Sequence, residues 1–194
     1  MKEINFLLVG VGGQGTLLAS NILAEVGLRA GYDVKKSEVH GMAQRGGSVS
    51  SHVRWGECVR SPLIGAGEVD ILVAFERIEA LRHLEALRPQ AQVLVNDHAI
   101  IPMTVTAGDA VYPDQTQVRA ALQQATPNAH LVPGVAMAEK LGNARANNVL
   151  ILGVLAQWLD VDVKIWQDVI SERVPPKYKA LNLKAFAHGR ALQI

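Results

Sequence analysis

Gly10-Val11-Gly12-Gly13-Gln14-Gly15 forms a G-x-G-x-x-G pattern immediately after the largely apolar run 4–9. Such a run is typical of a strand that is buried on both faces. Residues 13–29 then carry apolar side chains at helical spacing, and Gly31 is suited to end that helix. The order of strand, glycine turn and helix predicts a Rossmann-like βα unit, because glycines permit the tight turn and the close packing of helix on strand.

The ligand of this glycine turn is less well defined by the sequence. A dinucleotide site needs an acidic residue at the end of the second strand to hold the ribose, and the stretch 34–38 offers only Glu38. The pattern therefore disfavours ordinary NAD(P) binding. Two alternatives stay open: the glycines serve packing alone, or the turn binds a phosphate. The residues of such a phosphate loop would be Gly10, Gly12, Gly13, Gln14, Gly15 and Thr16, with donors from Gln14 and Thr16.

Strand and helix patterns alternate along the rest of the chain, which predicts an α/β fold with a Rossmann-like, doubly wound and mostly parallel sheet. Further strands are expected at 32–39, 48–54, 70–75, 92–96 and 130–132, with short edge strands at 101–106 and 110–112. Helices are expected at 77–87, 115–125, 135–141, 147–159, 163–172 and 177–192. We expect residues 1–160 to form this domain and 161–194 to be its helical C-terminal extension, which either wraps its own domain or reaches a partner.

Composition excludes several classes of protein. The 194 residues carry a net charge of +1, so no basic surface for nucleic acid is indicated. One cysteine, Cys58, can form neither an internal disulfide nor the ligand set of an iron–sulfur cluster. The histidines are scattered, so no metal site is expected. The longest apolar run, 149–156, is too short to cross a membrane, and the N-terminus is unlike a signal peptide. A cytoplasmic location is expected.

A second motif follows the second expected strand. Its functional side chains are interleaved with glycines on one loop, a density that suggests close approach by a ligand or another chain. The loop comprises Glu38, His40, Gly41, Met42, Gln44, Arg45, Gly46, Gly47 and Ser48. Arg45 is the best candidate to contact a carboxylate or phosphate, since its planar fork matches either; the alternative is an ion pair with Glu38. For His40, a structural role and a functional one are both open.

A third polar cluster precedes the most apolar helix. It consists of Asn143, Arg145, Asn147 and Asn148. Asparagine serves well in helix caps, so capping and loop bracing is the favoured interpretation. The alternative is a polar lining for an interface or for the mouth of the glycine turn.

Together these motifs resemble the gamma-type domain of 2-oxoacid:ferredoxin oxidoreductases. The resemblance rests on G-x-G-G-Q-G at 10–15, E-x-H-G-M-x-Q-R-G-G at 38–47 and L-G-N-x-R-x-N-N at 141–148. Ser61-Pro62-Leu63-Ile64 and F-E-x-x-E-A at 75–80 look like the version found as the small (beta) subunit of indolepyruvate ferredoxin oxidoreductase.

The resemblance implies a subunit without cofactors of its own, inactive alone, in an oxidoreductase complex. A large partner subunit would carry thiamine diphosphate and iron–sulfur clusters, decarboxylate a 2-oxoacid such as indolepyruvate to an acyl-CoA, and pass electrons to ferredoxin. CoA would be a co-substrate, and the loop 38–48 would face the partner near the active-site or CoA entrance. No catalytic residue is expected in this chain, and a homodimer is expected when it is expressed alone. The rival interpretation is a free-standing nucleotide- or acyl-CoA-binding protein with a regulatory role.

Overall fold

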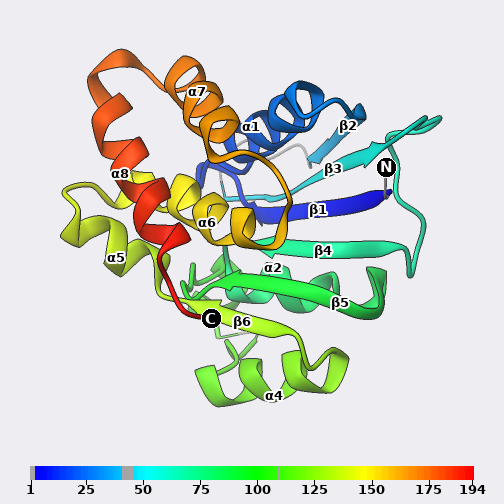
Figure 1. The fold of residues 1–194 in the computed structure, drawn as a ribbon. Helices are drawn as coiled ribbons and strands as arrows, with labels where there is room; N and C mark the ends of the chain where they lie inside the picture. Colours follow the sequence, from blue (N-terminus) through cyan, green and yellow to red (C-terminus); the bar gives the residue numbers. More distant parts are fainter. Residues whose placement is uncertain (1–2, 41–45, 109) are drawn as a thin grey trace.

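The computed structural model describes residues 3–40, 46–108 and 110–194. The described residues form a six-stranded sheet in the order β2-β3-β1-β4-β5-β6. Its strands are β1 (Ile4–Val11), β2 (Asp33–His40), β3 (Ser48–Gly56), β4 (Val69–Ala74), β5 (Leu87–Asn96) and β6 (Ala129–Val132). β1, β4, β5 and β6 pair in parallel, whereas β3 runs antiparallel to both β1 and β2. The expected mostly parallel α/β sheet is confirmed, with one antiparallel strand inserted (Figure 1).

Helices cover both faces of the sheet, which explains why β1 is buried along almost its whole length. One face carries α1 (Thr16–Arg29), α5 (Gly134–Lys140), α6 (Asn147–Leu155), α7 (Val163–Arg173) and α8 (Lys179–Arg190). The other face carries α2 (Arg77–Arg82) and α4 (Gln115–Ala125). Within the described ranges, no helix is long and apolar enough to cross a membrane.

The C-terminal helices pack on the domain itself. Trp166 of α7 and Phe186 of α8 are fully buried in the same apolar cluster as Phe6 of β1. Helices α6 and α8 approach backbone to backbone, since a Cβ at Gly189 would lie 2.0 Å from the Leu150 carbonyl oxygen. Residues 163–190 therefore pack on their own domain, as one of the two alternatives for the tail expected. The domain boundary expected at 160 stays a prediction.

Three expectations of secondary structure are wrong. Residues 101–106 are no strand: a short helix, α3 (Met103–Thr106), begins after Pro102, a residue suited to the first turn of a helix. Residues 110–112 are irregular. The helix expected at 77–87 ends at Arg82, a 3₁₀ turn spans Leu84–Ala86, and β5 starts at Leu87.

Pro89 fails to stop β5 because the strand bulges around it. The ladder to β4 jumps from Val69↔Leu87 to Ile71↔Gln92, and Gln90 has a φ of 64°. A bulge leaves the intervening residues outside the ladder, so the missing N–H of proline is tolerated there.

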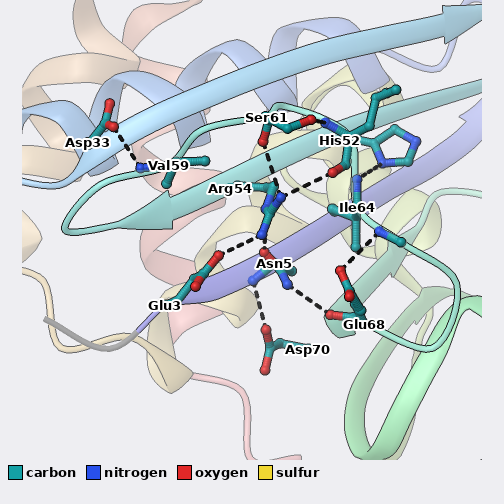
Figure 2. A network of polar contacts seen from close by, with 12 residues as sticks. Glu3, Asn5, Asp33, His52, Arg54, Val59, Ser61, Ile64, Glu68 and Asp70 are labelled. Carbon is teal, nitrogen blue, oxygen red and sulfur yellow. Dashed lines mark hydrogen bonds and ion pairs between the residues drawn. The ribbon is translucent and has the colours of Figure 1, made fainter.

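A polar network ties down the long β3–β4 connection at the amino ends of β1 and β4 (Figure 2). Arg54 donates to the Asn5 side-chain oxygen (2.8 Å) and to the backbone carbonyls of Ser61 (3.2 Å) and Leu63 (3.1 Å), and it pairs with Glu3 (2.6 Å). The Ile64 N–H donates to Nδ1 of His52 at 3.2 Å. This edge of the sheet is thus a structural anchor, on the side opposite the glycine turn.

Candidate functional site

The glycine turn lies at the carboxyl end of β1, where α1 begins. Gly13 and Gly15 have φ angles of 104° and 83°, which L side chains rarely adopt. A Cβ at Gly10 would lie 2.8 Å from the Thr16 hydroxyl oxygen, so this glycine is also required by packing. The structure thus contains the expected strand, turn and helix. Gly15 is the N-cap residue of α1.

The side chain of Gln14 is used within the turn. Its Oε1 accepts from the Val11 N–H at 2.8 Å, and its Nε2 donates to the Phe75 carbonyl at 2.8 Å. The Thr16 hydroxyl is buried and bonds to none of the described residues. The Gln14 amide is therefore already bonded within the protein. Phosphate contacts by Gln14 and Thr16 stay predictions.

The second motif returns to the glycine turn through its last residues. Gly12 N–H donates to the Gly47 carbonyl at 2.8 Å, and Gly46 N–H to the Gly12 carbonyl at 3.4 Å. The β1–β3 ladder then starts with Val11 opposite Ser48. His40 ends β2 opposite Val49 of β3, so β2 and β3 form a hairpin whose second strand begins beside the turn. Gly41, Met42, Gln44 and Arg45 lie outside the described residues.

A pocket of about 560 Å³ lies between the turn, the start of α1 and the ends of β2 and β3. Its lining is largely apolar, and its residues are Val11, Gly12, Gly13, Gly15, Thr16, Leu17, Leu18, Asn21, Glu38 and Val49. Glu38 is the only acidic residue in that lining, and it forms an ion pair with Lys36, which also donates to the Asn21 side chain at 2.6 Å. Lys36 thus compensates the negative charge that Glu38 would otherwise bring to this pocket.

A second pocket of about 390 Å³ lies on the other side of the turn, beyond the carboxyl end of β4. Two almost fully buried carboxylates, Glu76 and Glu79, line it. Glu76 accepts from the N–H groups of Glu79 (3.0 Å) and Ile100 (3.1 Å) and from the Tyr112 hydroxyl. Burial and then this bond to Glu76 raise the pKa of Tyr112 above its ordinary value, so the hydroxyl stays protonated.

Glu76 and Glu79 were not chosen as site residues from the sequence, although F-E-x-x-E-A was part of the resemblance. The signal that identifies them is the position of two acids directly after a buried strand, where open α/β sheets bind ligands. Glu79 accepts from the Ser48 hydroxyl and thereby joins this pocket to the second motif.

The asparagines of the third cluster brace backbone. Asn143 Oδ1 accepts from the Arg145 N–H at 2.9 Å, and Asn147 donates to the Ala144 carbonyl at 2.7 Å. Asn148 Nδ2 donates to the Gly15 carbonyl at 3.4 Å and so lies against the glycine turn. Bracing thus accounts for the three asparagines. The exposed Arg145 guanidinium has no partner among the described residues.

Metal-binding groups are scattered over the described parts of the chain. There, no three His, Cys, Asp or Glu side chains gather where they could hold a metal ion. The exposed Cys58 is the single cysteine of the sequence, so no set of thiolates exists for a cluster.

Comparison with known proteins places these motifs in a family. Residues 5–192 match the family described as pyruvate ferredoxin/flavodoxin oxidoreductase. The indolepyruvate oxidoreductase subunit IorB of Archaeoglobus fulgidus is 43% identical over 189 residues, covering 96% of this chain and 94% of the relative. The IorB subunit of Thermococcus kodakarensis is 38% identical, with 97% and 95% covered.

Solved structures share the fold. The gamma subunit of a keto/oxoacid ferredoxin oxidoreductase from Geobacter sulfurreducens aligns with a TM-score of 0.69 at 22% identity, covering 96% of this chain and 95% of that one. A 2-oxoglutarate:ferredoxin oxidoreductase from Magnetococcus marinus aligns with a TM-score of 0.76 at 20% identity, covering 98% of this chain and 31% of the longer one. The glycine turn, the residues around it and the match over almost the whole length agree: this chain belongs to the pyruvate ferredoxin/flavodoxin oxidoreductase family.

Proposed function

We propose that this chain is the small, cofactor-free subunit of a 2-oxoacid:ferredoxin oxidoreductase that acts on indolepyruvate or another arylpyruvate. The observation that carries the proposal is the 43% identity to an indolepyruvate oxidoreductase subunit over 96% of the chain. The described parts of the motifs add support, because the glycine turn, Gly46–Ser48 and Asn148 meet at one edge of the sheet. The activity belongs to the complex, and the chain alone is inactive.

Thiamine diphosphate and iron–sulfur clusters belong to the large partner subunit in this proposal. The residues of this chain do not fit a cluster, since one cysteine cannot supply its thiolates. The partner therefore carries out decarboxylation and passes electrons to ferredoxin. We expect such a complex in the cytoplasm, a reducing compartment in which cysteine side chains remain thiols.

The contribution of this chain is to bind CoA and to close the entrance to the active site. The pocket lies at the start of α1, where the first backbone N–H groups of a helix have no partner within the helix, and its apolar walls come from Leu17, Leu18 and Val49. Backbone N–H groups suit a phosphate, and the walls suit the apolar parts of a CoA molecule. The ion pair with Lys36 reduces the repulsion that the Glu38 carboxylate would exert on a phosphate.

Reconstitution tests the function directly. The chain is co-expressed with its large subunit, and ferredoxin or viologen reduction is measured with indolepyruvate, phenylpyruvate, pyruvate and 2-oxoglutarate, with and without CoA. We expect arylpyruvate- and CoA-dependent reduction by the complex and none by either subunit alone. Full activity of the large subunit by itself would contradict the proposal. A nucleotide retained by the isolated chain, with no binding to the large subunit, would favour a free-standing binding protein instead.

Arg45 is the residue of the second motif whose removal is most informative. A guanidinium binds a carboxylate or phosphate through two parallel hydrogen bonds, so Arg45→Ala should lower kcat/KM of the complex about tenfold or more. Arg119→Ala, an exposed arginine on α4, is the matched control and should leave turnover unchanged. Normal turnover of an assembled Arg45→Ala complex would remove this arginine from the proposed role.

A further inference from the structure

The side-chain carboxylate of Glu79 is almost fully buried. The residue is 4% exposed, and burying a charge is unfavourable unless hydrogen bonds compensate. One carboxylate oxygen accepts from the Ser48 hydroxyl, and the other lies 3.5 Å from the guanidinium of Arg82, whose side chain is 56% exposed. The Ser48 hydroxyl is therefore the only described uncharged side chain that bonds this carboxylate.

Glu79 is itself held firmly. Its N–H donates to the carboxylate of Glu76, which precedes α2 and also binds Ile100 and Tyr112. The acid thus presents a fixed acceptor to the first residue of β3. Ser48 in turn follows directly on Gly46 and Gly47, the residues that form two backbone hydrogen bonds with Gly12.

These contacts form a continuous path from α2 to the glycine turn. It runs from Glu76 to Glu79, across to Ser48, and through Gly47 to Gly12. Residues of this path line both pockets: Gly12 lines the larger one, and Glu76, Glu79 and Ser48 line the smaller one. A shift of Ser48 would consequently move the backbone that bounds the larger pocket.

We propose that Glu79 is a positioning residue: through the Ser48 hydroxyl it fixes the end of the second motif against the glycine turn and so sets the shape of the CoA pocket. This inference rests on the proposed function. Neither Glu79 nor its hydrogen-bond partner Ser48 lines the CoA pocket, so Glu79 reaches the reaction only through Ser48 and through Gly12, which does line it.

The contact is well suited to a test because the fold does not depend on it. β3 pairs with β1 from Val11↔Ser48 to Ile4↔Trp55 and with β2 from His40↔Val49 to Asp33↔Gly56, and Ser48 is not part of the apolar core on either face of the sheet. Removing one hydroxyl should leave the domain folded. Ser48→Ala removes the donor, Ser48→Thr restores it, and Ser50→Ala is a matched control on the same strand, where the hydroxyl lies 3.5 Å from the Val39 carbonyl.

Two measurements are made on the assembled complex. In Ser48→Ala and Glu79→Gln we expect faster amide hydrogen exchange confined to residues 46–50 and 11–15. We also expect the KM for CoA to rise about five- to tenfold with a smaller change in kcat, because each variant loses a hydrogen bond to a charged group. Ser48→Thr should recover both values, and Ser50→Ala should match wild type. Because the pair acts as a unit, the double variant should be no worse than the more affected single variant.

The outcomes separate this inference from the proposed function. If the wild-type complex shows no CoA-dependent 2-oxoacid oxidation, the proposed function fails, and exchange alone still reports on positioning. Unchanged exchange in Ser48→Ala would overturn the positioning role. Altered exchange with an unchanged KM for CoA in an active complex would overturn its link to the pocket.

Discussion

The side chain of Asn148 lies directly against the backbone of Gly15, although 133 positions separate them along the chain. Nδ2 of Asn148 donates to the Gly15 carbonyl at 3.4 Å, and a Cβ on Gly15 would lie 2.2 Å from the same nitrogen. Asn148 is buried, and its Oδ1 accepts from the Val149 N–H at 2.8 Å. The start of α6 therefore closes over the start of α1, and only glycine fits between them.

Gly15→Ala should destabilise the protein by about 2–3 kcal/mol, from backbone strain at positive φ together with the clash. Gly13→Ala is the matched control: its φ of 104° is also strained, but nothing lies within 4 Å of its Cβ position. The control should lose about 1–2 kcal/mol, from strain alone. Urea unfolding measures both, and equal losses would show that Asn148 does not restrict this position.

The local parts of this site were predictable from sequence, and the long-range parts were not. The strand, turn and helix around Gly10–Gly15 follow from apolar runs and glycine spacing within 30 residues, so the pattern carries the whole signal. The contacts that assemble the site join Gly15 to Asn148 and Ser48 to Glu79, across 133 and 31 positions. The spacing of residues along the sequence does not predict which polar side chains from distant positions come into contact.

The antiparallel strand shows the same limit. Residues 48–54 were expected as a strand from their alternation, but the hairpin with β2 that inserts β3 beside β1 depends on pairing in space. Glu38 pairs with Lys36, two positions away on the same face of β2, a contact that the sequence pattern alone does not indicate. The alternative pair of Glu38 with Arg45 stays a prediction, because Arg45 lies outside the described residues.

Gln14 should be sensitive to the loss of one hydrogen-bond donor. In Gln14→Glu the acceptor for Val11 N–H is kept, but a carboxylate oxygen replaces the amide that donates to the Phe75 carbonyl. We expect a loss of about 1–2 kcal/mol in unfolding free energy, because two acceptors would face each other. Gln123→Glu, on the exposed side of α4, should change stability by less than about 0.5 kcal/mol. Equal stability of the two variants would contradict the bridging role.

Arg54 should not tolerate replacement by lysine. Its guanidinium reaches four oxygen atoms, on Glu3, Asn5, Ser61 and Leu63, from a side chain that is only 16% exposed (Figure 2). An ammonium group lacks the planar fork, so Arg54→Lys should lose about 2 kcal/mol and speed amide exchange in residues 61–65.

Lys164→Ala on helix α7 is the control for loss of an exposed ion pair, since Lys164 pairs with Asp168 and its removal should change stability by less than about 0.5 kcal/mol. If residues 61–65 exchange at the wild-type rate in Arg54→Lys, the connection between β3 and β4 is held by its other contacts.

His52 should make stability depend on pH. Burial, and then the charge of nearby His83, lower the pKa of His52, and its Nδ1 accepts from the Ile64 N–H in the neutral form. The unfolded chain, with an ordinary histidine pKa of about 6.5, therefore takes up a proton at a higher pH than the folded protein does. This contribution is complete above that pH and falls as the solution is acidified toward the lowered pKa of the folded state.

His52→Asn retains an acceptor for the Ile64 N–H but does not titrate, so its unfolding free energy should fall less than that of wild type between pH 7.5 and pH 5.0. His188→Asn, exposed on α8, should follow the wild-type curve. Urea unfolding at a series of pH values gives the slopes, and NMR titration of the His52 ring reports its pKa directly. Parallel curves for wild type and His52→Asn would mean that other groups cause the acid sensitivity, and that protonation of this ring does not oppose the bond to Ile64.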